Sequence, residues 1–138
     1  MSTSHIKKGQ VSMEFVAMIS FVLLIFTGFY AGISHKQMVA AQYNRDLQAK
    51  MLAEYITYQL DLVLTYGGNF TKKVHFPESI DGTQYNITYS ERDNCNLIFV
   101  NYENKFAFSC TSARVNGSLY SGNNILKNRG GDIIYANQ

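Results

Sequence analysis

A long uncharged apolar segment lies near the N-terminus and differs in pattern from the rest of the chain. Residues 15–33 are predominantly apolar and include no charged side chain. A helix of about 19 residues, rising about 1.5 Å per residue, spans a hydrocarbon core of about 30 Å. We therefore predict a transmembrane helix over residues 10–34.

Residues 36–66 show a second pattern, in which apolar and charged side chains alternate at helical spacing. This segment contains neither proline nor glycine, and residues 67–69 (Gly-Gly-Asn) supply a stop signal. We predict that residues 35–68 continue the first helix and pack against a sheet of the same chain; the alternative is a separate helix after a break near His35. The apolar positions with a period near 3.6 are Val39, Tyr43, Leu47, Met51 or Leu52, Tyr55, Tyr58 or Gln59, and Leu62 or Val63.

Beyond residue 69 the pattern becomes that of extended chain, with β-branched and aromatic runs between turn residues such as Pro77 and Asp81-Gly82. The predicted strands are residues 74–76, 84–89, 95–101, 105–111, 115–120 and 132–135. Together these patterns predict an α+β fold, with one long N-terminal helix packed on a small antiparallel sheet of four to six strands.

The residues that precede the apolar segment are charged in an unusual way. Lys7 and Lys8 stand before it, which places that end of the helix in the cytoplasm. Glu14 stands at the entrance to the apolar segment, where a carboxylate is costly unless it has a partner.

The junction Gly9-Gln10, followed by Ser12, Glu14 and Phe15, resembles the K-K-G-Q-x-S-x-E-F pattern of archaeal type IV pilin-like proteins with a class III signal peptide. The resemblance covers about the first 33 residues, and the rest of the chain matches it only in general layout. It implies cleavage between Gly9 and Gln10 by a prepilin peptidase. The implied organisation is a leader over residues 1–9, an apolar assembly helix over 10–34, an amphipathic continuation over 35–68 and an extracellular β-rich domain over 69–138.

The resemblance also implies a function and a set of partners. The chain would be a major or minor pilin of a surface filament used for adhesion, lying in the cell membrane before assembly. Its partners would be other pilin subunits, the prepilin peptidase, an assembly platform in the membrane and membrane lipid. The alternative is a non-polymerising, single-span membrane-anchored extracellular binding module that the same peptidase processes.

Three other interpretations of the N-terminus compete with the pilin leader. An archaeal flagellin is a near relative, but its start is usually Gly-rich after the junction and lacks the Gln-x-Ser-x-Glu arrangement. An ordinary secretory signal peptide would be cut after its apolar region, where Gly32-Ile33-Ser34 offers a small-x-small site. A plain single-span anchor explains the lysines and the apolar segment, but it leaves Glu14 and Gly9-Gln10 without a role.

Two features of the helix bear on assembly. After cleavage, the α-amino group of Gln10 can pair with Glu14 of a neighbouring subunit; the alternative is that Glu14 only favours the positive end of its own helix dipole. Gly28 and Gly32 form a G-x-x-x-G pattern, which lets another helix approach closely and which also arises by chance in membrane helices.

Two cysteines and three sequons bear on the compartment of the β-rich domain. If Glu103-Asn104 form a hairpin turn, Cys110 lies diagonally opposite Cys95, and a turn shifted by one residue places the two directly opposite. Both registers allow a disulfide, which indicates an oxidising exterior; the alternative is two buried free thiols. The sequons are Asn69-Phe70-Thr71, Asn86-Ile87-Thr88 and Asn116-Gly117-Ser118, which makes these asparagines candidate N-glycosylation sites.

Composition and charge exclude several function classes. With 138 residues, 46% of them hydrophobic, the chain suffices for one small domain beside a membrane segment. Without Lys7 and Lys8 the 12 basic side chains become 10, equal to the 10 acidic ones, so no basic stripe suggests nucleic-acid binding. His35 and His75 lack metal-ligand spacing, and no catalytic motif occurs. We therefore expect no enzyme activity, no cofactor and no metal.

Overall fold

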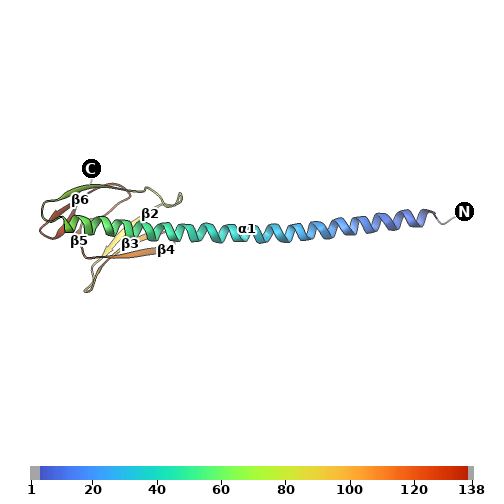
Figure 1. Ribbon diagram of the computed structural model, residues 1–138, viewed down its shortest axis with the longest axis horizontal. Coiled ribbons are helices and arrows are strands. Elements are labelled where there is room, and N and C mark those ends of the chain that lie inside the picture. Colours follow the sequence, from blue (N-terminus) through green and yellow to red (C-terminus); the bar gives the residue numbers. More distant parts are fainter. Residues whose placement is uncertain (1–3, 137–138) are drawn as a thin grey trace. The chain divides into compact units, whose positions relative to one another are not determined.

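The computed structural model describes the backbone of residues 4–136 and the side chains of residues 13–134. It contains two units, Met1–Gln42 and Tyr43–Gln138. Helix α1 (Ser4–Thr65) is a single long helix that contributes residues to both units (Figure 1). The prediction of one long helix is confirmed, and the break considered near His35 does not form.

In the first unit, α1 has no tertiary partner among the described residues. All side chains from residue 13 to residue 42 are exposed. The hydroxyls of Ser20 and Thr27 donate to the carbonyl oxygens of Val16 and Leu23, each at 2.8 Å. Because these bonds satisfy the hydroxyl protons within the helix, the surface from residue 15 to residue 33 is almost wholly apolar.

In the second unit, one face of α1 packs on the strands and forms the centre of the core. The buried positions recur every three or four residues, which is the spacing of one helix face. They are Ala49, Leu52, Ala53, Ile56, Leu60 and Val63. Strand residues such as Phe76, Ile98, Val100, Leu126 and Ile133 join the same core cluster.

The strands of the second unit form two sheets. They are β1 (Thr71–Phe76), β2 (Tyr85–Ser90), β3 (Asn96–Tyr102), β4 (Lys105–Thr111), β5 (Arg114–Asn116), β6 (Gly122–Arg129) and β7 (Asp132–Ala136). One sheet has the order β1-β6-β7-β5 and the other the order β2-β3-β4. All neighbours are antiparallel except β5 and β7, which are parallel.

The α+β class with a long helix on β-sheet is therefore confirmed, but a single antiparallel sheet of four to six strands is not what forms. The prediction missed β6, whose start, Gly122-Asn123-Asn124, has the composition of a loop. Asn124 is buried, and its Nδ2 donates to the carbonyl oxygens of Tyr120 and Gly122 at 2.9 and 2.8 Å. A buried amide with such partners is tolerated within a sheet.

The predicted strand over residues 115–120 is also shorter in the structure. It ends at Asn116, because Gly117 has a φ of 126° and turns the chain away. This left-handed backbone conformation is one that glycine adopts without strain.

The end of α1 follows the prediction and adds a contact that only the fold supplies. Gly67, at a φ of 86°, donates its N–H to the carbonyl oxygen of Leu64 at 3.2 Å. Asn128 on β6 donates its Nδ2 to the carbonyl oxygens of Val63 and Leu64, both at 3.2 Å. Since the last carbonyls of a helix lack partners within it, Asn128 caps α1 from the sheet.

Candidate functional site

The most distinctive surface of the first unit is the apolar side of α1. Large hydrophobic side chains from Met13 to Val39 are between 42% (Ile25) and 77% (Met13) exposed. An exposed apolar surface this extensive is typical of a site that contacts a membrane or another protein. Part of this helix has a mean hydropathy of 2.2 and is long and apolar enough to cross a membrane. A signal sequence near an N-terminus has the same length and composition.

Glu14 lies at the start of this surface and is exposed. Within the described side chains, no ion pair is formed by its carboxylate. The side chains of Lys7, Lys8, Gln10 and Ser12, like residue Gly9, lie outside the range whose side chains are described, and Phe15 is exposed. Cleavage at Gly9-Gln10 and the pairing of Glu14 with the Gln10 amine therefore remain predictions.

The two helical glycines lie in a shallow groove on α1. A Cβ built at Gly28 or Gly32 would meet no atom within 4 Å outside the helix's own backbone. The groove has a volume of about 500 Å³ and is lined by Leu24, Ile25, Gly28, Phe29, Gly32, Ile33 and Lys36. Its shape permits the close approach of another helix, and the assembly role of the two glycines remains a prediction.

A second apolar surface lies on α1 in the second unit, on the side opposite the buried face. Tyr43, Leu47, Met51, Tyr55 and Tyr58 are 40–68% exposed and recur every three or four residues. We call these five residues the exposed stripe. The apolar positions that the sequence analysis placed at helical spacing therefore lie on two faces of α1, some buried against the sheets and the others in the exposed stripe. The buried face is the one that carries the small residues Ala49 and Ala53, which let the helix approach the sheets closely.

Charged and polar side chains hold the second-unit part of α1 against the β3–β4 hairpin. Asp46 accepts hydrogen bonds from Lys105 Nζ, at 3.0 Å to each oxygen, and from the Tyr102 hydroxyl at 2.9 Å. The hydrogen bond from Lys105 lowers the pKa of Asp46, and that from Tyr102 adds to the effect. Burial and the bond to Asp46 raise the pKa of Tyr102 to about 12.

Arg45 links two turns at the same end of the domain. Its Nη1 lies 2.7 Å from Glu103 Oε1, and its Nε lies 3.8 Å from Asp81 Oδ2. Both acidic residues adopt positive φ values, 50° and 49°, which are unfavourable for residues other than glycine. The guanidinium therefore stabilises two tight turns against α1.

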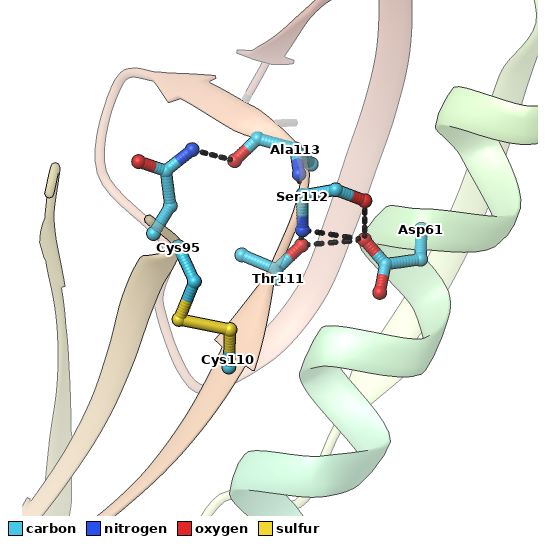
Figure 2. The surroundings of a disulfide bond; sticks show 7 residues. Asp61, Cys95, Cys110, Thr111, Ser112 and Ala113 are labelled. Atoms are coloured by element: carbon cyan, nitrogen blue, oxygen red, sulfur yellow. Dashed lines mark hydrogen bonds between the residues drawn. A yellow bond between two sulfur atoms is a disulfide. The ribbon is translucent and has the colours of Figure 1, made fainter. Parts of the chain in front are cut away.

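Asp61 of α1 contacts the C-terminal end of β4, as Asp46 contacts its N-terminal end (Figure 2). Its Oδ1 accepts hydrogen bonds from the Thr111 hydroxyl at 2.7 Å and from the N–H and hydroxyl of Ser112, both at 3.1 Å. Because Lys105 meets Asp46 and Thr111 meets Asp61, β4 runs beside α1 in the same direction.

Cys95 and Cys110 form a disulfide beside this contact, with a Cα–Cα distance of 5.8 Å (Figure 2). The predicted disulfide is confirmed. The observed register pairs Leu97 with Cys110 across a turn at Glu103-Asn104, so the first of the two registers considered is the one that forms.

The three sequon asparagines are exposed. Asn69 follows the end of α1, Asn86 lies on β2 and Asn116 ends β5. Their accessibility permits glycosylation, and glycan attachment remains a prediction.

The histidines and acidic residues of the described part form no group of three that is arranged to hold a metal ion. His75 lies on β1, and its Nδ1 is 2.8 Å from Asn123 Oδ1.

Comparisons with models of protein families, with curated proteins and with solved structures found no match.

Proposed function

We propose that this chain is a structural subunit of a type IV pilus-like surface filament of the archaeal kind. In this proposal a prepilin peptidase removes residues 1–9, and the helix that follows remains on the mature subunit. The helices of many subunits form the filament core, and the β-domains form its outer surface, where they contribute to adhesion.

The observation that carries the proposal is that one helix offers two separate, largely exposed apolar surfaces, of which only the Tyr55 ring contacts a strand residue, Phe76. A bilayer covers about 20 residues of a helix, which accounts for the surface from residue 13 to residue 33. It leaves the exposed stripe, from Tyr43 to Tyr58, in water. Helices of neighbouring subunits cover both surfaces, which favours a filament subunit over a membrane-anchored module that does not polymerise.

The position of Glu14 supports a defined register between subunits. Once the helices leave the lipid and pack together, an unpaired carboxylate among apolar side chains costs several kcal/mol, as an order of magnitude. A cationic α-amino group on Gln10 of a neighbouring subunit removes most of that cost and selects one axial offset. This role rests on the resemblance of residues 7–15 to pilin leaders.

The second unit supports an exterior location. Its disulfide is of a kind that persists outside the cytoplasm. The Lys7-Lys8 pair on the other side of the apolar segment gives the matching orientation, with the β-domain outside.

The substitution Glu14→Ala tests the proposal. We expect the variant to insert into membranes in normal amount and to form no filaments, as judged by membrane fractionation and electron microscopy of cells. Glu78→Ala, which removes an exposed carboxylate from the β-domain, should leave filaments unchanged. Abundant filaments from Glu14→Ala would refute the pairing role.

N-terminal sequencing of the mature protein tests the processing step. A mature chain that begins at Gln10 supports the proposed leader. A chain that begins near His35 would indicate an ordinary secretory signal peptide, and the proposed filament core would then be lost with it.

A further inference from the structure

Strand β4 has an open edge with little of the protection usual for exposed strands. It is the last strand in the order β2-β3-β4. In the described chain, no backbone hydrogen bond outside the sheet ladders involves β4. A two-residue turn joins β3 to β4. The backbone N–H and C=O groups of Lys105, and of every second residue after it, therefore point toward β3. The N–H and C=O groups of Phe106, Phe108 and Cys110 consequently point to the open edge.

Apolar side chains accompany these open backbone groups. Phe106 and Phe108 are 62% and 57% exposed. Both contact Phe99 on β3, with ring centroids 5.9 and 6.1 Å apart. The three rings make one aromatic patch on the sheet face that points away from α1, since the alternate residues Ile98 and Val100 are buried in the core.

Strand β4 itself carries few of the residues that usually prevent edge-to-edge association. Exposed edges are normally blocked by charged side chains, proline or bulges. The one charged residue of β4 is Lys105, whose ammonium is held by both oxygens of Asp46. The edge strand β1, by contrast, carries Lys72 and Lys73.

A groove lies beside the start of β4. It has a volume of about 720 Å³, is open to the surroundings, and is lined by Asp46, Lys50, Tyr102, Asn104, Lys105, Phe106, Ala107 and Phe108. Of the candidate glycan sites, Asn69 and Asn116 lie on other parts of the chain, whereas Asn86 lies on β2, two strands across from Phe106 on the same face of the sheet.

We propose that the β4 edge binds the β4 edge of a second copy of this chain, and that this contact joins one filament to another. An antiparallel pair centred on Phe108 places Phe108 opposite Phe108 of the second copy and Phe106 opposite Cys110, using all three open residues. Such a contact between identical strands has two-fold symmetry. A filament grows by head-to-tail contacts that repeat in one direction, so a two-fold contact on its outer surface links separate filaments. This inference rests on the proposed filament function.

The symmetry allows a test by charge pairing at one position. We expect wild-type filaments to associate laterally, and Phe108→Lys filaments and Phe108→Glu filaments each to remain single because like charges meet across the two-fold axis. A mixture of the two variant filaments should associate again, and added salt should weaken that association. Electron microscopy and light scattering of purified filaments provide the measurements, and Gln84→Lys, at an exposed position before β2, should associate as wild type does.

Each result bears on the inference. The inference is supported if the mixture of the two variants associates while each variant by itself stays dispersed. Lateral association of either single variant, or a mixture that stays dispersed, would overturn it, as would wild-type filaments that never associate. A chain that forms no filaments at all would instead overturn the proposed function, so the two failures are distinct.

Discussion

Residues 13–42 and residues 43–134 place most of their apolar side chains in opposite environments. In the first region, the large apolar side chains of one helix are all exposed. In the second, the same helix buries Ile56, Leu60 and Val63 completely against two sheets. The difference teaches that the β-domain has its own core, whereas the N-terminal region depends on surroundings that the described chain does not supply. The exposed stripe is the exception, since it belongs to the second region but resembles the first.

The largest effect is expected from a charge on the exposed stripe. Met51→Lys should abolish filaments, because burying an unpaired ammonium between subunits is costly, while thermal unfolding of the β-domain should hardly change. Met51→Leu keeps an apolar side chain of similar volume and should assemble normally. Filaments from Met51→Lys would show that the stripe stays in water after assembly.

A pair of truncations on the same helix separates the two regions by stability. Ile56→Ala should lower the free energy of unfolding by about 2–5 kcal/mol, because it leaves a cavity in the core. Leu24→Ala should leave the unfolding of the β-domain unchanged, since Leu24 is exposed in the first region. Denaturant titration in detergent, followed by near-UV circular dichroism, measures both; equal losses would mean that the regions fold as one unit.

Removing the disulfide should have a slightly smaller effect, confined to the second region. The combined change Cys95→Ser and Cys110→Ser opens a covalent loop with a sequence separation of 15, and about 3 kcal/mol of stability is expected to be lost in the chain-entropy model. A reducing agent should destabilise the wild-type protein to the same extent and leave the double variant unaffected. A reducing agent without effect on wild type would contradict the disulfide.

The smallest effect concerns alkaline pH. Burial raises the pKa of Tyr85 from 10.0 to about 12, and burial with the bond to Asp46 raises that of Tyr102 from 10.0 to about 12. Between these pH values the folded state holds protons that the unfolded state has lost, so stability should fall as the pH rises from 10 to about 12. Replacing both residues by Phe should make this decline shallower in thermal unfolding scans; an unchanged slope would assign it to other groups.

Features that depend on neighbouring residues were well predicted from the sequence. The apolar segment, the helix stop at Gly67 and the first of the two turn registers considered, at Glu103-Asn104, agree with the structure. Each is set by local chemistry: uninterrupted apolar side chains, a left-handed glycine and a two-residue turn. The disulfide followed because Cys95 and Cys110 flank that hairpin.

Features that depend on distant residues were missed. Strand β6 was not predicted, because Asn124 and Asn128 are unfavourable in a strand until a fold supplies carbonyl partners for their amides. The division into two sheets, the parallel β5–β7 pair and the aromatic patch on the open face of β4 likewise depend on contacts between separate segments.

The order of apolar, amphipathic and extended segments established the fold class, because side-chain periodicity and turn chemistry act over a few residues. Which face of α1 would meet the sheets could not follow from periodicity, since both faces carry apolar residues. Tertiary packing decided it: Ala49 and Ala53 allow close approach, while the bulkier Tyr43, Met51 and Tyr58 remain outside. The surfaces on which the proposed assembly depends are therefore the apolar residues that this packing left uncovered.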